Sequence, residues 1–357
     1  MTVDSSTLPG TNAADPAEPH TDPTLARRRL VTGVLALPLF FLIFLPGLFL
    51  GALHSPAPDG MDVAVIGDGP QAVAAVEQAT AATEFDLRRL PDADAARTEL
   101  RDLAIRAAYD PATGDLYIAS AGGTQSTAAA QQFFSALAHS AGTAVHIHDV
   151  APLPTADPLG NGPLYLGIGA IVGGMLSGLI ISMVGSTLRV RAQLLTMTLM
   201  AATVAAIETC YGWVVFDLFS SNTWAGAATM AGLALVAGLV TLSGARVIGP
   251  AMIMVSILVL VLGGVTASGL PTQLDMAPEF YRWIHEILPT ARGLSALRSI
   301  VYFDVHAITG DLLVMMAWGL ASLAVLALTR RRASIPDSPV LDDMETDEAI
   351  AIAVAAT

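Results

Sequence analysis

Long apolar runs alternate with polar segments along the chain, and the apolar runs set its organisation. A membrane-spanning helix needs about 20 mainly apolar residues. Runs of about that length occupy residues 31–53, 164–184, 194–216, 224–243, 247–269 and 312–329. The pattern therefore predicts a polytopic α-helical membrane protein with six transmembrane helices. The first run is longer than the apolar core of a signal peptide and shows no obvious A-x-A cleavage pattern, so we interpret it as a retained helix.

The segment between the first two runs, residues 54–162, has the periodicities of a folded α/β domain. Short β-rich runs at 62–68, 85–91 and 144–150 alternate with helical patterns at 71–82, 93–107 and 124–141. Residues 108–121 contain a turn with Asp110, Pro111 and Gly114 between two further strands. The predicted order is β-α-β-α-β-β-α-β. At roughly 100 residues the domain is large enough to fold alone.

The remaining segments complete the predicted domain plan. Residues 1–30 are rich in Pro, Asp, Ser and Thr without periodicity, which is typical of a disordered tail. Residues 163–329 form a five-helix membrane domain, and residues 330–357 form an acidic tail. Both tails are expected to be solvated.

Arginine placement predicts the orientation in the membrane. Six spans put both termini on one side, and short cytoplasmic loops carry an excess of basic residues. Nine arginines fall on the side of the termini: Arg27, Arg28, Arg29, Arg189, Arg191, Arg246, Arg330, Arg331 and Arg332. The short loops of the other side hold Arg282, Arg292 and Arg298. We therefore expect a multi-pass protein of the plasma membrane with cytoplasmic termini and an extracytoplasmic α/β domain.

Composition excludes several kinds of chemistry. The chain has 357 residues, of which 54% are hydrophobic and 13% charged, and its net charge is −14. All 17 basic residues are arginine, so the chain has no lysine for a Walker A loop or a Schiff base. If ATP drives the protein, a separate ATP-binding subunit must bind it. The acidic balance argues against a nucleic-acid partner, and the single Cys210 forms no intramolecular disulfide.

The predicted α/β domain offers only weak site signals. Gly67 and Gly69 follow the first strand, but Val73 stands where a dinucleotide fingerprint needs a third glycine. His146 and His148 alternate on a strand and face one way; they are either a metal pair or two exposed histidines. No Ser/His/Asp arrangement in a recognisable context is present. We therefore expect no enzyme activity, no cofactor and no resident metal.

The membrane half carries one acidic residue inside a predicted span. Glu208 lies about 15 residues after the cytoplasmic start of its span, roughly 22 Å deep at 1.5 Å per residue. A carboxylate at this depth is a functional hypothesis by default. It could line a transport pathway, carry a proton or pair with Arg298. It could also be structural, as a helix-end residue that reaches the outer interface or as a protonated hydrogen-bond donor.

Glycines in the second span predict close helix contacts. Gly169 and Gly173 form one G-x-x-x-G pattern, and Gly174 and Gly178 form another. Small residues at this spacing let helix backbones approach each other closely. Packing within the bundle is the favoured interpretation, and a dimer interface is the alternative.

Residues 270–311, before the last span, predict an outer re-entrant helical hairpin. Residues 276–288 form an amphipathic helix with an apolar side made of Phe280, Trp283, Ile284 and Ile287. Pro289 ends it, and residues 290–301 form a second helix with Arg292 and Arg298. These two arginines either meet lipid phosphates or balance acidic residues such as Glu286 and Asp304, and both are candidates for a transport pathway.

This layout resembles the ABC-2-type membrane proteins, and most closely their YhgE/Pip (phage infection protein)-like branch. The residues that carry the resemblance are in the run HEILPTARGLSALRSIVYF, where Pro289, Gly293, Arg298, Tyr302 and Phe303 match the family's LP…GLR…YF block. The early outer strand at 62–68 matches as well. The resemblance covers nearly the whole chain by topology, whereas only about 20 residues are motif-like.

The resemblance implies a permease-like membrane subunit that forms a homodimer and exports a hydrophobic or envelope-related substrate with a separate ATPase. The chain departs from typical ABC-2 permeases in two places. Residues 1–26 show no amphipathic docking helix, and the loop at 185–193 is short. The alternative interpretation is therefore a non-transporting surface protein whose outer domain is a docking platform or receptor.

Overall fold

The computed structural model describes residues 23–79, 84–184, 188–219 and 222–330, together with the side chains of most of them. The predicted tails fall largely outside these ranges, since residues 1–22 and 331–357 are not described. The chain divides into two compact units, residues 1–43 and 44–357, and every tertiary contact discussed below lies within the second. The described residues form a mostly helical fold with one small mixed sheet.

The sheet has five strands in the order β2-β1-β3-β4-β5. These strands are β1 (Met61–Ile66), β2 (Phe85–Leu90), β3 (Ala107–Asp110), β4 (Asp115–Ile118) and β5 (His146–Asp149). β1 pairs in parallel with β2 and β3, the β3–β4 hairpin is antiparallel, and β4 pairs in parallel with β5. A short turn between β3 and β4 accounts for the single antiparallel pair, because parallel neighbours need a longer crossover.

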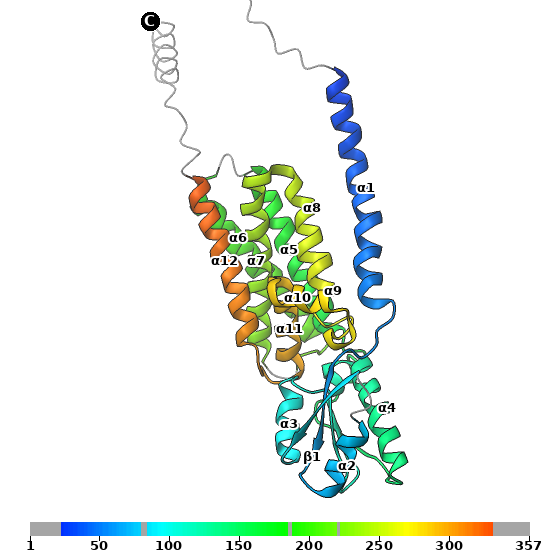
Figure 1. Cartoon of the computed structure of the whole chain (residues 1–357). Helices are drawn as coiled ribbons and strands as arrows, with labels where there is room; N and C mark the ends of the chain where they lie inside the picture. The colour runs from blue at the N-terminus through cyan, green and yellow to red at the C-terminus, as the bar shows by residue number, and fades with distance from the viewer. Residues whose placement is uncertain (1–22, 80–83, 185–187, 220–221, 331–357) are drawn as a thin grey trace, which may run out of the picture. The chain divides into compact units, whose positions relative to one another are not determined.

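Helices cover both faces of the sheet, and the alternation along β1 explains how (Figure 1). Met61, Val63 and Val65 point into a core with α2 (Pro70–Ala79) and α4 (Thr124–Ser140). Ala64 and Ile66 point to the opposite core with α3 (Ala93–Arg101). Alternate strand residues face opposite sides of a sheet.

The predicted β-α-β-α-β-β-α-β order is confirmed over residues 61–149. Most boundaries lie within about two residues of the prediction, and the clearest difference is that α3 ends at Arg101 rather than at residue 107. Leu103 adopts a left-handed backbone conformation with φ 58°, which a helix cannot continue. The chain then enters β3.

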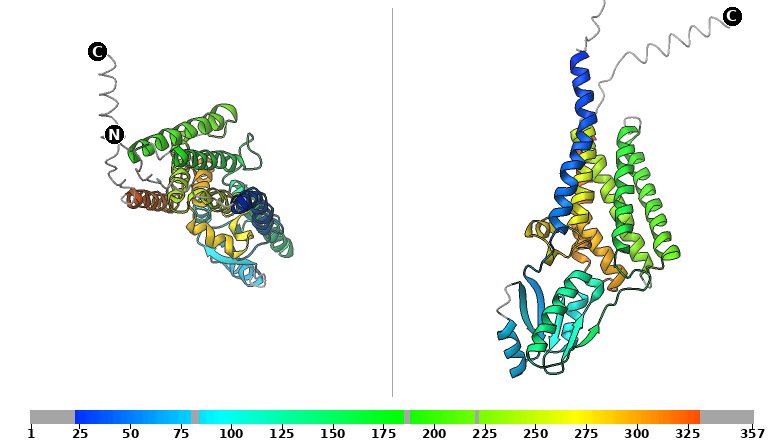
Figure 2. Two further views of the ribbon diagram at one scale, coloured as in Figure 1. Left: turned by 90° about the horizontal axis from the view of Figure 1, so that it is seen from above. Right: turned by 90° about the vertical axis from the view of Figure 1, so that its right-hand side faces the viewer.

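Within the described ranges, four helical stretches are long and apolar enough to cross a membrane: Gly162–Val184, Val190–Val215, Thr223–Thr266 and Thr309–Thr329. The first stretch is α5 (Gly162–Val184), and the second is α6 (Val190–Cys210) followed by the π-helical segment η2 (Tyr211–Val215). The third runs from α7 (Thr223–Ile248) to α9 (Gly264–Thr266), and the fourth lies in α12 (Thr309–Arg330). These helices mark the chain as a membrane protein. α5, α6 and α7 lie side by side (Figure 2).

The stretch Thr223–Thr266 is 44 residues long and holds two of the predicted spans, 224–243 and 247–269. It reverses direction at η3 (Gly249–Ala251), where Gly249 has φ 66°. α8 (Met252–Ser256) then runs back along α7, because the hydroxyls of Thr241 and Ser256 lie 3.0 Å apart. In a straight helix these residues, 15 positions apart, would be separated by about 22 Å. The π-helical segment η4 (Ile257–Gly263) connects α8 to α9.

The predicted first span, 31–53, lies within α1 (Pro23–Leu53). This helix begins eight residues earlier than the predicted boundary between the tail 1–30 and the span. Its apolar part with described side chains, Pro38–Leu53, is shorter than a full span. At its end the carbonyl oxygen of Leu48 accepts a 2.7 Å hydrogen bond from the hydroxyl of Tyr281.

Glycines of α5 face two neighbouring helices. A Cβ atom at Gly174 would overlap the carbonyl oxygen of Ala234 in α7, and one at Gly178 would overlap that of Gly238. Gly169 and Gly173 face α6 instead, against Glu208 and Val204. All four predicted packing glycines therefore lie at contacts within this chain.

The predicted hairpin forms α10 (Glu279–Ile287) and α11 (Pro289–Tyr302). Eleven residues of α11 are buried, and the helix packs on α5, α7 and α12. In α10 the buried side chains are Tyr281 and His285. Of the predicted apolar side, Ile284 is partly buried against a small core cluster, whereas Phe280, Trp283 and Ile287 are exposed. An apolar surface of this kind suits contact with the lipid interface.

Candidate functional site

The candidate site is the junction between the α/β domain and the hairpin segment, residues 269–303. This segment inserts a side chain into each of the two cores of the sheet. Met276, at the end of η5 (Leu274–Met276), joins the core under α2 and α4, and Phe303 joins the core under α3. Both side chains are buried. The hairpin and the sheet are therefore packed as one body at this point.

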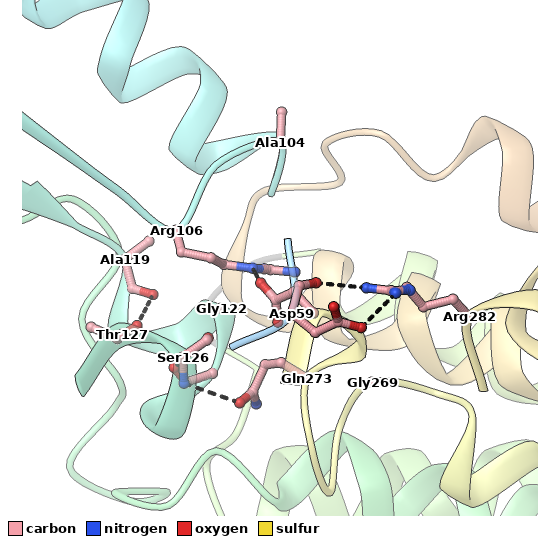
Figure 3. Close-up of polar contacts among 12 residues, drawn as sticks. Asp59, Ala104, Arg106, Ala119, Gly122, Ser126, Thr127, Gly269, Gln273 and Arg282 are labelled. Carbon is pink, nitrogen blue, oxygen red and sulfur yellow. Dashed lines mark hydrogen bonds and ion pairs between the residues drawn. The ribbon is translucent and has the colours of Figure 1, made fainter. Parts of the chain in front are cut away.

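A largely buried ion pair fixes the junction. The guanidinium Nε of Arg106, beside β3, donates to Asp275 Oδ2 at 2.5 Å. Their side chains are 15% and 12% exposed. The backbone amide of Asp59 also donates to the carbonyl oxygen of Asp275 at 2.9 Å. At the rim, Arg282 Nη2 donates to Asp59 Oδ2 at 2.8 Å (Figure 3).

Gln273 caps a helix of the α/β domain from outside that domain. Its side-chain oxygen accepts a 3.3 Å hydrogen bond from the backbone amide of Ser126, in the first turn of α4 (Figure 3). Gly123 precedes this helix with φ 144°, and a Cβ atom there would overlap the Gln273 side chain. A residue with a side chain at position 123 would thus displace the cap.

Arg298, in α11, is the most unusual side chain of the junction. It is 8% exposed, and its Nη1 donates to the carbonyl oxygens of Gly269 at 2.9 Å and Gly122 at 3.4 Å. Burial lowers the pKa of Arg298 to about 10, so the side chain stays charged at neutral pH. Its Nε is buried without a hydrogen-bond partner among the described residues. The prediction that Arg298 balances an acidic residue finds no ion pair in the described part of the chain.

A polar cavity of about 160 Å³ opens beside Arg298. It lies between the start of α4, the loop before α5 and the segment after α9. Its lining residues are Ser120, Ala121, Gly123, Thr124, Gln125, Leu153, Leu159, Gly160, Asn161, Leu270, Pro271, Gln273 and Arg298. Arg298 is the one charged residue among them.

Arg292 and the other residues of the predicted motif hold the hairpin in place. Arg292 pairs with Glu286, which is one of the two alternatives left open by the sequence, and also with Asp311 at 3.0 Å. Pro289 begins α11, and Gly293 packs closely against Leu233 of α7.

Tyr302 links the hairpin to the start of α5. Its hydroxyl donates to the carboxylate of Asp157, which also accepts from the backbone amides of Asn161 and Gly162. Burial, strengthened by the hydrogen bond to Asp157, raises the pKa of Tyr302. The phenol therefore remains a neutral donor.

Glu208 and Arg298 do not form the ion pair that the sequence allowed. The half-buried Glu208 carboxylate lies against Gly169 of α5, whereas Arg298 contacts backbone carbonyl groups. Within the described ranges Glu208 has no ion-pair partner. Its place between α5 and α6 keeps it a candidate for a transport pathway.

The histidines of β5 do not gather further metal ligands. His148 Nε2 lies 2.9 Å from Asp115 Oδ1, and its ring stacks on Tyr117. The hydrogen bond from His148 lowers the pKa of Asp115. No group of three metal-ligating side chains occurs in the part of the chain that the structure describes.

His285 gives the hairpin a pH dependence that can be measured. Burial, with a smaller effect of Arg292, lowers the pKa of His285 from 6.5 to about 4, and its Nδ1 donates to the carbonyl oxygen of Ala267. Between these values the unfolded chain binds the proton more readily, so the free energy of unfolding falls as the pH falls from 6.5 to 4. The expected loss is about 3 kcal/mol.

Unfolding in detergent as a function of pH tests this expectation. His285→Asn keeps a side-chain donor for Ala267 but does not titrate in this range. The free energy of unfolding of this variant should therefore fall less than that of the wild type on acidification. Equal slopes for both proteins between pH 6.5 and 4 would contradict a neutral, buried His285.

Sequence reasoning missed the partners that make the junction. Arg106 and Asp275 are 169 positions apart, and Asp157 and Tyr302 are 145 apart. One feature of the sequence pointed to the junction: Gln273 and Asp275 are polar residues that come soon after an apolar run.

No family model, curated protein or solved structure matches this chain. The class of the molecule therefore rests on its own features, which are those of a helical membrane protein with a mixed α/β domain joined to a helical hairpin.

Proposed function

We propose that this chain is the membrane subunit of an ABC-2-type exporter of the YhgE/Pip-like branch. In this proposal it moves a hydrophobic or envelope-related substrate with energy from a separate ATP-hydrolysing subunit. One observation carries the proposal. A helix pair, α10 and α11, stands before the last membrane helix and is packed into the bundle, where the resemblance places its hairpin.

The helix geometry supports six membrane passes in this proposal. The reversal at Gly249 divides the stretch Thr223–Thr266 into two antiparallel passes. With α1, α5, α6 and α12 the proposed total is six. An even number of passes puts both termini on one side of the membrane, which the arginine distribution assigns to the cytoplasm.

Cysteine labelling tests this topology. In a Cys210→Ser background, a cysteine at Thr124 in α4 should react with a membrane-impermeant maleimide added to intact cells. A cysteine at Ser338 should react only after the cells are opened. Labelling of both positions from outside, or of neither, would contradict the proposed six-pass arrangement.

The energy source must come from another chain, because this sequence has no lysine for a phosphate-binding loop. Mild-detergent purification of the tagged full-length protein from its own cells, followed by mass spectrometry, tests this. The proposal expects an ATP-binding subunit in stoichiometric amount, together with a second copy of this chain. Envelope proteins without such a subunit would contradict it.

One observation favours the alternative, a docking platform. β5 forms an edge of the sheet, all four of its residues are exposed, and Ile147 is 49% exposed. An open edge strand can accept a strand from a partner protein. Recovery of envelope or secreted proteins with the wild type, and their loss on Ile147→Lys, would support this second function.

Within the exporter proposal Glu208 is the pathway residue to examine first. Its carboxylate lies at the α5–α6 contact without an ion pair in the described ranges. Glu208→Gln keeps the shape of the side chain and removes its charge. Reduced transport at unchanged stability would support a role in the pathway.

A further inference from the structure

We propose that the cavity beside Arg298 binds a phosphate-type oxyanion, either free phosphate or the phosphate group of a lipid. The site would join the α/β domain to the outer hairpin. This inference does not depend on export, because it rests on the charge, burial and hydrogen bonding of the junction alone.

The first argument is a charge count at the junction. Arg106 pairs with Asp275, and Arg292 pairs with Asp311. Glu286 is largely exposed. A third buried acid, Asp157, accepts hydrogen bonds from the hydroxyl of Tyr302 and from two backbone amides, and it has no ion pair among the described residues. Arg298 remains as a third buried cation without a carboxylate partner in the described part of the chain. Buried charges in proteins are normally paired, so the position of Arg298 is one at which an anion would be stabilised.

The second argument is the free hydrogen-bonding capacity of Arg298. A guanidinium group has five N–H donors in a planar fork that suits phosphate oxygens. Only Nη1 donates to described residues, namely to the carbonyl oxygens of Gly122 and Gly269. Nε has no partner, and no bond of Nη2 to a described residue is found. Arg298 is more than nine-tenths buried and lines the cavity.

The third argument is the start of α4, which faces the same cavity. This helix has 17 residues and no side-chain cap from Gly123. The amide of Ser126 is taken by Gln273, and that of Thr127 by Gly123. The amides of Thr124 and Gln125, both cavity-lining residues, have no partner in the described ranges. The N-terminus of a helix favours anions through these free amides and its dipole.

The remaining lining gives the cavity its selectivity. No acidic side chain is among its lining residues. Asn161 and Gln273 add neutral polar groups, whereas the hydroxyl of Ser120 donates to Asp149. The volume of about 160 Å³ fits a phosphate group but not an acyl chain. A lipid would therefore enter with its head group, and Leu153, Leu159 and Leu270 would border the rest of the molecule.

Binding of inorganic phosphate to the purified full-length protein, measured by calorimetry, tests the proposal. The wild type should bind phosphate saturably at one site per chain, and Arg298→Gln should weaken binding at least tenfold. Because that variant could fail to fold, Gln125→Glu provides a second test. It places a carboxylate at the cavity and should also weaken binding at least tenfold.

Gln132→Glu makes the same chemical change further along α4, outside the cavity, and should leave phosphate binding unchanged. Native mass spectrometry separates the two sources of the anion. A phospholipid that stays bound to the wild type but not to Gln125→Glu identifies the anion as a lipid head group. The proposal is overturned if the wild type binds neither phosphate nor phospholipid, or if Gln125→Glu binds as well as Gln132→Glu. Arg298 would then be balanced by Asp275, whose Oδ1 has no partner among the described residues.

Discussion

Gly174→Ala is expected to destabilise the protein by about 3 kcal/mol or more, the largest effect of any single methyl group considered in this fold. The added Cβ would overlap the carbonyl oxygen of Ala234 in α7. A backbone atom cannot move aside as a flexible side chain does. The helices α5 and α7 would have to separate, and α5 contributes Leu166, Ala170 and Ile171 to the main core of the bundle.

Gly310→Ala is the matched control, because nothing lies within 4 Å of a Cβ atom at that position in α12. Thermal unfolding in mild detergent should show a melting temperature at least about 5 °C lower for Gly174→Ala than for the wild type. The control should have the same melting temperature as the wild type. Equal stability of the two variants would mean that α5 and α7 do not make the close contact described above.

Asp275→Asn is expected to cost about 3 kcal/mol, because it leaves the Arg106 charge largely buried without a counter-ion. The pair holds the α/β domain to the hairpin at 2.5 Å and is screened only weakly by solvent. Asp94→Asn provides the comparison at the surface. Its pair with Arg97 at 2.7 Å is exposed, and such pairs contribute about 0.5 kcal/mol or less.

Denaturant titration of both variants measures the difference. The double variant Arg106→Leu/Asp275→Leu should recover most of the loss, since replacing a buried pair by apolar residues is often neutral. If Asp275→Asn and Asp94→Asn lose the same small amount of stability, the junction pair does not hold the two parts together.

Periodicity predicted the local structure well. The strands and helices of residues 61–149 follow the predicted order, because alternating and 3.6-residue patterns are local properties of the chain. Five of the six apolar runs likewise fall on the four long apolar stretches, and the pattern LP before residue 290 marks the boundary between α10 and α11.

Tertiary contacts were less accessible from the sequence. Nothing local indicates that Gln273 caps α4 or that Asp157 accepts a hydrogen bond from Tyr302. The early end of α3 depends on the left-handed conformation of Leu103, which its residue type does not favour. The exposed apolar side of α10 shows a related limit, since an amphipathic pattern alone does not distinguish a core from a lipid interface.

The central claim, that this chain works as the membrane subunit of an exporter, is tested most directly by ATP hydrolysis. The tagged chain would be purified in mild detergent from its own cells, transferred to lipid nanodiscs and assayed for ATP hydrolysis. The account predicts activity that copurifies with the chain and disappears when the partner subunit is stripped away, because this chain has no lysine for a phosphate-binding loop. Activity no higher than in a mock purification, with envelope proteins bound instead, would contradict export and favour the docking platform.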